Sequence, residues 1–422
     1  MSKVVVIGAG ALGLTAAFEL LKKGYKVTVI ERSEKIGGLL SSFKIGSSYI
    51  EEYYHHLFQT DQDAISLIKE LGLEEKLWWR RPETAVFCEG SVYPFDSPID
   101  VLRFSPLTFL ERLRLGLVLL YLKLKPTYKG FESVEASFWI KKWMGTNSYT
   151  KLWEPLLKGK FGEYAQDIAM SWFWSRIKVR TSKLGYLRGG FYQLYETLSK
   201  KIISLGGEIQ TGVEINEISG KGSEIEIATN EGIKNFDACI ATIPTNIFFK
   251  LTRSLPSSFV KKYQWPDYFG AQIVFLELSR PITNLYWLNI AERNFPFLAY
   301  IEHTNFMPKE DYGGETLVYL GNYFSKDDPR YLQEENSTIE QYLSFMRKIN
   351  PKFKKSWLIK GSVFRTPFAQ PIVSVGYHKH IPPHETPIKN LYLANMAQVY
   401  PQDRGQNYSI RLAKKVVETY FP

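Results

Sequence analysis

Cysteine is nearly missing from this chain: its 422 residues include only Cys88 and Cys239. Two cysteines cannot build a disulfide framework, and their spacing is not typical of a metal site. Cys239 lies in an apolar segment, so we expect its thiol to be buried. This composition favours a reducing compartment, and a cytoplasmic location is the expectation.

Histidine is also scarce, with six residues. Three of them, His378, His380 and His384, gather in a proline-rich segment near the C-terminus. A metal site needs fixed geometry and usually a further ligand. We therefore expect no metal here.

Long apolar runs are missing as well. The longest, residues 115–122, is interrupted by Gly116 and is much shorter than the roughly 20 residues that span a bilayer. The N-terminus already has the pattern of a core strand, so no signal peptide is predicted.

Residues 100–125 form a leucine-rich segment with interspersed Lys and Arg, and two interpretations of it stay open. A core or lid helix of a substrate domain is the commoner case. A basic amphipathic helix at a membrane surface has the same composition. Peripheral membrane contact therefore remains an alternative to a purely cytoplasmic location.

Acidic residues are outnumbered, with 43 Asp and Glu against 53 Lys and Arg and a net charge of +10. A basic chain favours anionic partners. The basic residues are dispersed and no nucleic-acid module is recognisable, so nucleic acid is not an expected partner. The expected partner is a small-molecule substrate, either anionic or lipid-like. The oligomeric state does not follow from the sequence.

The first forty residues contain the clearest pattern in the chain. Residues 4–7 predict a buried strand, residues 14–23 a helix and residues 25–30 a second strand. The motif Gly-Ala-Gly-Ala-Leu-Gly at residues 8–13 joins the first strand to the helix, and Glu31 ends the second strand. This arrangement is typical of a βαβ unit that binds a dinucleotide.

Each part of the motif has a chemical reason. Gly8 permits a tight turn, Gly10 lets a pyrophosphate approach the backbone, and Gly13 lets the helix pack closely on the sheet. The N-terminus of the helix presents unpaired N–H groups and a positive dipole end to phosphates. Glu31 is placed to accept hydrogen bonds from ribose hydroxyls.

The residues that follow distinguish FAD from NAD. Glu31-Arg32 and Gly37-Gly38 resemble the E-R-x-x-x-x-G-G extension of the flavin amine oxidase, protoporphyrinogen oxidase and phytoene desaturase superfamily. In that superfamily the glycine pair passes close to the diphosphate and ribityl chain of the flavin. The resemblance therefore implies FAD as the cofactor.

Two later segments resemble the same superfamily. Residues 185–244 resemble the return to its FAD domain, where the residue matching Val213 contacts adenine through its backbone and the strand ends at Pro244. Residues 390–408 resemble its C-terminal signature, in which N–H groups at the start of the last helix face the flavin pyrimidine. The usual Gly-Asp or Gly-Glu is replaced here by Ala394-Asn395, and Asn can still hydrogen-bond to ribityl or phosphate groups.

No cysteine lies near the C-terminal signature, so a cysteinyl-flavin there is excluded and FAD is expected to bind non-covalently. The motifs together imply the following cofactor-binding residues: Gly8, Gly10, Ala11, Leu12, Gly13, Glu31, Arg32, Gly37, Gly38, Leu39, Val213, Pro244, Asn395, Gly405, Gln406 and Asn407.

The candidate catalytic residues are Tyr54, His55, His56 and Arg404. The first three lie in a polar-aromatic stretch that resembles the superfamily segment passing near the flavin ring. Residues 56–60 also resemble a His-x-Phe-x-Thr element of UDP-galactopyranose mutases. Hydrogen bonding or proton transfer by the two histidines and a purely structural role are equally supported. Arg404 is expected to steady an anionic substrate or the reduced flavin.

The resemblance implies an α/β fold in which a Rossmann-like FAD-binding domain is split in the sequence by an inserted α+β substrate domain. We expect residues 1–80, 185–247 and 360–422 in the FAD domain, and residues 81–184 and 248–359 in the substrate domain.

Three functions are compatible with these residues. The first is an FAD-dependent oxidoreductase that takes hydride from a C–N or C–C bond. The second is a non-redox flavoenzyme that acts on a sugar nucleotide, similar to UDP-galactopyranose mutase. The third is an isoprenoid desaturase at a membrane surface, which residues 100–125 would favour.

Overall fold

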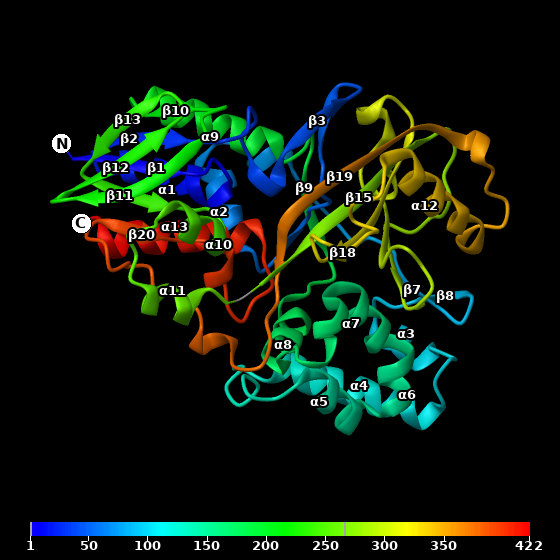
Figure 1. The fold of residues 1–422 in the computed structure, drawn as a ribbon. Helices are drawn as coiled ribbons and strands as arrows, with labels where there is room; N and C mark the ends of the chain where they lie inside the picture. Colours follow the sequence, from blue (N-terminus) through cyan, green and yellow to red (C-terminus); the bar gives the residue numbers. More distant parts are fainter. Residues whose placement is uncertain (1, 266) are drawn as a thin grey trace.

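The computed structural model describes residues 2–265 and 267–422, which form two domains on either side of a shared cavity (Figure 1). The first domain is built on a parallel sheet with the strand order β10-β2-β1-β14-β20. Apolar side chains bury β1 and β14 almost completely, as expected for parallel strands covered on both faces. The strands are β1 (Lys3–Ile7), β2 (Lys26–Ile30), β10 (Glu208–Gln210), β14 (Ala238–Ala241) and β20 (Leu391–Leu393).

Alternate residues of β1 face two different layers. Val4 and Val6 pack with the helices on one side, whereas Val5 and Ile7 pack with a three-stranded meander and two short helices on the other. The helices of the first side are α1 (Ala11–Lys22), α2 (Gln62–Glu70), α9 (Tyr192–Ser204) and α13 (Gln406–Tyr420). The other side holds β11 (Ile215–Lys221), β12 (Glu224–Thr229), β13 (Gly232–Phe236), α10 (Thr245–Leu251) and α11 (Ser257–Tyr263).

The second domain combines a seven-stranded sheet with a helical bundle that lies below it in Figure 1. The strand order is β19-β15-β18-β17-β16-β7-β8, antiparallel except between β16 and β7. Helix α12 (Glu335–Ile349) packs on this sheet. The strands are β7 (Thr84–Cys88), β8 (Ser91–Pro94), β15 (Tyr268–Leu278), β16 (Trp287–Ile290), β17 (Ala299–Glu302), β18 (Thr316–Phe324) and β19 (Leu358–Pro371).

The bundle has an aromatic core that includes Trp139, Trp172 and Trp174. Its helices are α3 (Pro98–Arg103), α4 (Phe109–Leu124), α5 (Ala136–Met144), α6 (Thr146–Ser148), α7 (Glu154–Phe161) and α8 (Met170–Val179). The hairpin β3 (Ser42–Ile45)–β4 (Ser48–Glu51) and the small sheet of β5 (Leu57–Phe58), β9 (Leu184–Leu187) and β6 (Leu77–Arg80) complete the fold.

Two expected domain boundaries lie elsewhere. Phe248 and Leu255 share a core with β1, so α10 and α11 belong to the first domain rather than the second. Strand β19 pairs with β15 along most of its length, so residues 360–371 belong to the second domain. In both places the apolar partners lie far away in the sequence, and local composition gives no sign of them.

Two elements also differ from the expectation. Helix α1 begins at Ala11, three residues before the predicted start, because Gly10 already serves as its N-cap. The single strand predicted over residues 208–218 is divided into β10 and β11. Gly212 adopts a positive φ of 72° between them, and this turn carries the chain from the sheet to the meander.

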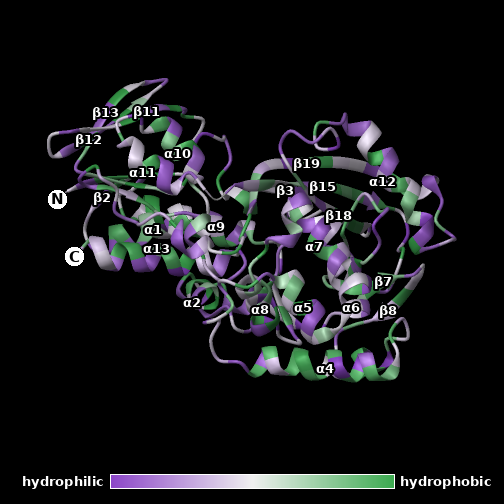
Figure 2. Ribbon diagram, turned by 60° about the horizontal axis from the view of Figure 1, so that its bottom comes forward, coloured by the Kyte–Doolittle hydropathy of each residue, from purple (hydrophilic) through white to green (hydrophobic). Residues whose placement is uncertain are grey.

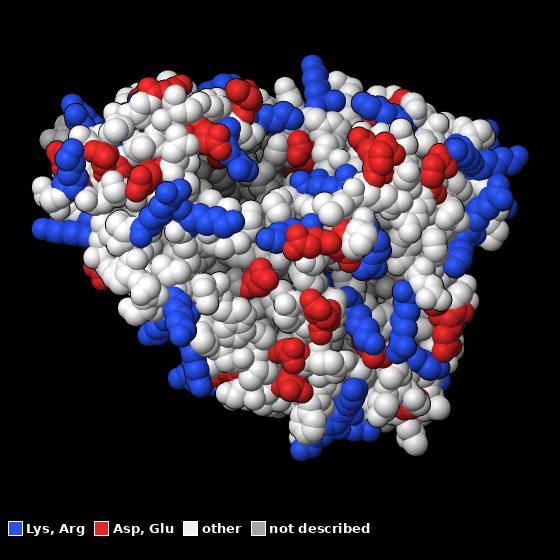
Figure 3. Space-filling view, in the orientation of Figure 1, with Lys and Arg blue, Asp and Glu red and all other residues white. Residues whose placement is uncertain are grey.

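The leucine-rich segment forms α3 and α4, which begin with capping boxes at Ser97 and Thr108. Helix α4 runs along the outer edge of the molecule (Figure 2), and only Leu115 and Leu122 among its residues are buried. It is therefore not a core helix. No helix within the described ranges is long and apolar enough to cross a membrane. Figure 3 shows Lys and Arg interspersed with Asp and Glu over the face displayed there.

Gly13 is the residue at which the first domain tolerates least change. A Cβ atom there would lie 1.8 Å from the carbonyl oxygen of Gly8, whereas a Cβ at the helical Gly116 would meet nothing closer than 3.9 Å. We expect Gly13→Ala to lower the free energy of unfolding by at least about 2 kcal/mol through overpacking. Gly116→Ala should leave it unchanged or raise it by about 1 kcal/mol. Urea unfolding followed by circular dichroism tests both, and equal effects would contradict the close packing.

Candidate active site

A cavity of about 1090 Å³ lies between the two domains and is lined by both. Every site residue predicted from the sequence lines it except Gly13, which packs α1 against β1 instead. Residues separated by up to about 400 positions in the chain therefore come together in one place. Their individual roles toward a cofactor remain predictions.

The glycines form a narrow cradle at one end of the cavity. Gly10 and Gly37 pair as an isolated parallel bridge, and the Gly37 N–H donates to the Ala9 carbonyl at 2.8 Å. A Cβ atom at Gly38 would lie 3.3 Å from the Cα of Gly10. Helix α1 begins here, and its first N–H groups have no partner within the helix. A diphosphate is the kind of group that such a helix start binds.

Glu31 lies beside the cradle, at the end of β2. Its two carboxylate oxygens accept hydrogen bonds from the N–H groups of Ala9 and Ser33, both at 2.8 Å. The Val213 N–H donates to the Glu31 carbonyl at 3.0 Å, so the expected adenosine contacts are neighbours. Each carboxylate oxygen keeps a further lone pair for a ribose hydroxyl.

The start of α13 reaches the cavity from another direction. The Gln406 side-chain oxygen accepts from the Tyr195 hydroxyl at 3.0 Å, and the Asn407 oxygen accepts from the Ala64 N–H at 3.1 Å. The amide nitrogens of both side chains are buried without a hydrogen-bond partner among the described residues. Because buried donors normally find an acceptor, these amides fit a ligand with carbonyl or ring-nitrogen acceptors, such as a flavin.

Asn395 serves mainly to hold the protein together. Its amide nitrogen donates to the Ile243 carbonyl at 2.9 Å and to the Thr245 hydroxyl at 3.0 Å. Its amide oxygen accepts from the Ala397 N–H at 3.0 Å. Only one lone pair of that oxygen is left, so the side chain has little capacity for the ribityl or phosphate contact expected from the sequence.

Tyr54, His55 and His56 line the part of the cavity next to the second domain. Burial lowers the pKa of His55 to about 4 and that of His56 to about 3, and it raises the pKa of Tyr54. His55 Nδ1 lies 2.5 Å from the Tyr53 carbonyl, so this nitrogen carries the hydrogen. All three side chains are thus neutral at pH 7, suited to hydrogen bonding rather than to a fixed charge.

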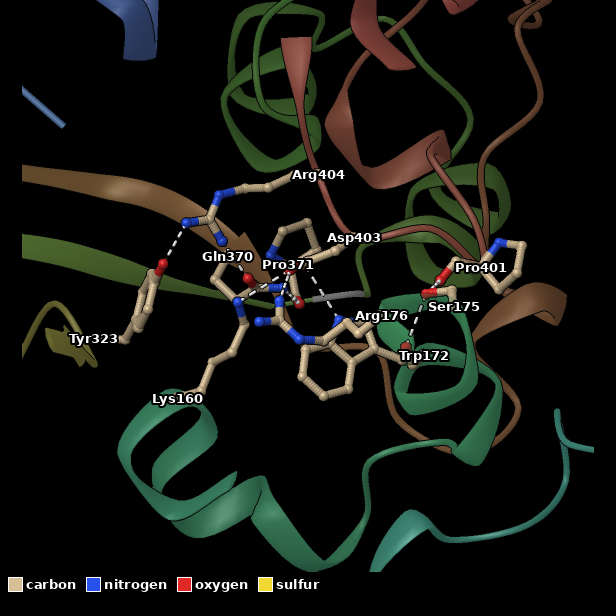
Figure 4. Close-up of polar contacts among 10 residues, drawn as sticks. All are labelled: Lys160, Trp172, Ser175, Arg176, Tyr323, Gln370, Pro371, Pro401, Asp403 and Arg404. Atoms are coloured by element: carbon tan, nitrogen blue, oxygen red, sulfur yellow. Dashed lines mark hydrogen bonds and ion pairs between the residues drawn. The ribbon is translucent and has the colours of Figure 1, made fainter. Parts of the chain in front are cut away.

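A cluster of charged side chains, not predicted apart from Arg404, lies at the same end (Figure 4). Asp403 pairs with Lys160 at 3.2 Å and with Arg176, and it accepts from the Trp172 indole at 3.2 Å. Arg404 donates to the Tyr323 hydroxyl at 2.5 Å and to Gln370. The charged members are Lys160, Arg176, Asp403 and Arg404, here named the cation cluster.

The cation cluster has more positive than negative charge. Burial disfavours a charge on Asp403, but Lys160, Arg176 and Arg404 outweigh it and hold the pKa of that carboxyl below its usual range. Burial lowers the pKa of Lys160 to about 8. Burial would raise the pKa of Tyr323, yet Arg404 and Lys160 lower it to about 8. At pH 7 the three cations surround one carboxylate, so this end of the cavity favours an anion.

The flavin family can now be assigned. The profile of the flavin-containing amine oxidoreductases matches residues 13–402. The chain belongs to this family. It is 24% identical to mitochondrial protoporphyrinogen oxidase of Nicotiana tabacum over 351 residues, which are 78% of this chain and 66% of that protein. It is 24% identical to 15-cis-phytoene desaturase of an Oncidium hybrid over 445 residues, covering 93% of this chain and 73% of that protein.

Solved structures share the fold over nearly the whole chain. An oxidoreductase from Methanosarcina mazei matches with a TM-score of 0.77 at 19% identity, covering 99% of this chain and all of that one. Reduced UDP-galactopyranose mutase matches with a TM-score of 0.78 at 18% identity, covering 99% and 95%. Together with these relatives, membership of the flavin-containing amine oxidoreductases confirms the predicted superfamily and the predicted split Rossmann-like fold. It also confirms, at this coarse level, the prediction that the protein is an FAD-dependent oxidoreductase.

The side chains of the histidine-rich segment contact other protein groups. His384 Nδ1 contacts the Leu393 carbonyl at 3.0 Å, and His380 stacks edge-on against Trp265. Within residues 2–265 and 267–422, no group of three His, Cys, Asp or Glu side chains has a geometry that suits a metal ion.

Among the described residues, Asp403 is the acid that pairs with the cation cluster, and its removal tests the charge balance. We expect Asp403→Asn to lower the free energy of unfolding at pH 7 by at least about 2 kcal/mol, because three cations then repel one another. Added inorganic phosphate should restore part of the loss. As a control, Asp63→Asn breaks the exposed pair with Arg411 at the other side of α13 and should change stability by about 0.5 kcal/mol. Equal losses without phosphate rescue would disprove the imbalance.

Proposed function

We propose that this protein holds FAD non-covalently and oxidises a C–N or C–C bond of an anionic small molecule. A hydride would leave one carbon of that bond for the flavin, and the second hydrogen would leave the neighbouring atom as a proton. The observation that carries the proposal is the single cavity with a diphosphate cradle at one end and the cation cluster at the other. Both ends belong to the same space, so a substrate held by the cations would lie next to a flavin held by the cradle.

The positions of the two thiols support non-covalent binding. Cys88 and Cys239 are buried in β7 and β14, and neither lines the cavity. Burial raises the pKa of Cys88 to about 11 and raises that of Cys239 further above its usual range. Neither sulfur is therefore a thiolate that a flavin could reach.

Bound FAD would supply the hydride acceptor. The protein would bind and orient the substrate and tune the electronic properties of the flavin. The start of α13 would stabilise negative charge at the flavin pyrimidine. Neutral Tyr54, His55 and His56 would orient the substrate by hydrogen bonds without adding charge. Lys160 Nζ and the Tyr323 hydroxyl have pKa values near 8, which suits them to hold or move a proton at neutral pH.

One observation favours a second candidate, a non-redox reaction on a sugar nucleotide. Arg180 lines the cavity together with the three cations of the cluster, and burial beside Arg176 lowers its pKa only to about 10. The cation cluster together with Arg180 suits a diphosphate as well as a carboxylate. The fold shared with UDP-galactopyranose mutase is compatible with this candidate.

Anaerobic spectroscopy separates the candidates. Heat or acid should release free FAD from the purified yellow protein. Bleaching of the flavin band by a porphyrinogen or an amine, without any added reductant, would support hydride removal. Turnover of UDP-galactopyranose only after dithionite reduction, with the flavin still reduced at the end, would support the second candidate. A protein that neither contains nor takes up FAD would overturn both.

Substitutions at Gly10 and Gly13 test cofactor binding and folding separately. Gly10 has an extended backbone, and a Cβ there would meet nothing nearer than 3.9 Å. We therefore expect Gly10→Ala to fold with wild-type stability but to bind FAD at least about tenfold more weakly, because the methyl group occupies the pyrophosphate approach. Flavin content per chain and urea unfolding of the apoprotein measure the two effects. Unchanged FAD affinity would place the diphosphate elsewhere.

The affinity for an anion should depend on pH. As the pH rises through about 8, Lys160 loses its positive charge and Tyr323 gains a negative one. Both changes weaken anion binding, and we expect affinity for inorganic pyrophosphate to fall about tenfold between pH 7 and pH 9. Flavin absorbance changes report the binding. Lys160→Arg keeps a cation throughout and should flatten the profile, and a flat wild-type profile would argue against this subsite.

A further inference from the structure

The largest group of exposed apolar side chains lies on the bundle, away from the cavity. Helix α4 exposes Phe109, Leu110, Leu113, Leu117, Leu120, Tyr121 and Leu124. The spacing of three and four residues places these side chains along one stripe of the helix. Leu115 and Leu122 face inward and are buried, so α4 is apolar on two sides.

Neighbouring helices extend the stripe. Ile99 and Leu102 of α3 and Phe138 and Trp143 of α5 are also exposed. Tyr121 stacks on Trp139 with the ring centroids 6.4 Å apart, and Trp139 lies 6.1 Å from Trp143, so α4 and α5 form a continuous surface. We name this surface, the outward side of α3, α4 and α5, the leucine face. Figure 2 shows α4 along the edge of the molecule, with green residues interspersed with purple ones.

Such a surface requires an occupant, because proteins seldom expose a contiguous apolar patch of this kind without one. The charge around it distinguishes between occupants. Residues 97–147 contain eight Lys and Arg against four Asp and Glu. Arg103, Lys141 and Lys142 are exposed beside the apolar stripe. A second copy of the chain on this face would bring like charges together, whereas anionic lipid headgroups would be attracted.

We propose that the leucine face docks on the surface of an anionic lipid bilayer. Leucines of α4 would enter the boundary between headgroups and acyl chains, and Lys and Arg at the rim would contact lipid phosphates. Tyr121 and Trp143 have the amphipathic rings that favour this depth. Docking needs neither FAD nor substrate, so it stands or falls separately from the proposed reaction.

Docking would hold the cavity near the lipid. Lys123 of α4 donates to the carbonyl of Lys178 at 2.9 Å, at the end of α8. Arg176 and Ile177 of α8 line the cavity. Helix α4 would thus connect the bilayer surface to α8, the helix that carries Arg176 of the cation cluster.

Vesicle flotation of the 422-residue chain tests the proposal. The probes are vesicles of phosphatidylcholine alone and of an equimolar mixture with phosphatidylglycerol. We expect the protein to float with the mixed vesicles at low salt, less at high salt, and little with phosphatidylcholine alone. A protein that stays at the bottom of the gradient with mixed vesicles at every salt concentration would overturn the proposal.

Two variants and a matched control assign the effect to the leucine face. Leu113, Leu117 and Leu120 changed together to Gln should reduce vesicle affinity roughly a hundredfold. Lys141 and Lys142 changed to Gln should reduce it about tenfold, with a smaller salt dependence. The control changes Ile233, Leu332 and Ile359 to Gln, three equally exposed apolar residues elsewhere, and should float like the wild type.

Two further outcomes would overturn the proposal. Equal flotation of the leucine variant and the wild type would place the lipid contact on another surface. Light scattering that finds a wild-type dimer and a monomeric leucine variant, without flotation of either, would make the face a contact between copies of this chain. Unchanged thermal unfolding of the variants confirms that they fold, as expected for exposed positions.

Discussion

The close approach of α1 to the end of β1 is the contact on which the first domain depends. Gly13 lies so near the Gly8 carbonyl that no side chain fits between the helix and the strand. Thr242, from β14's carboxyl end, donates to the Ile7 carbonyl at 2.7 Å and fills the remaining space. The start of α1 is thereby held at the carboxyl edge of the sheet, where ligands of parallel α/β sheets bind.

The second constraint is electrostatic and lies inside the molecule. On the face shown in Figure 3, acids and bases are interspersed, whereas three cations in the cavity share one carboxylate. Because these cations have little contact with water, their electrostatic effect on neighbouring groups is stronger. The pKa of Tyr323 is therefore well below that of an ordinary phenol. The positive charges are therefore already in place on the cavity wall before any ligand enters.

The helical bundle carries the leucine face on its outer surface and contributes Lys160 and Arg176 of the cation cluster to the cavity. In α8, apolar residues form the core while Arg176 reaches the cavity. In α4, the inward side forms the core and the outward side remains apolar. One bundle therefore contributes charged side chains to the cavity and apolar side chains to the outer surface.

The sequence by itself determined the βαβ unit, the cofactor motifs and the superfamily, because these depend on neighbouring residues and on spacings within a few tens of positions. Tertiary structure alone decided the cation cluster, since Lys160 and Arg176 come from two helices of the bundle, Tyr323 from β18 and Asp403 from the segment before α13, and no local pattern joins them. Tertiary contacts also set the domain boundaries and supply the hydrogen-bond partners of the Asn395 amide. They leave one side of α4 exposed. Leucine composition is the same for a core helix and for a surface helix, and only packing distinguishes the two.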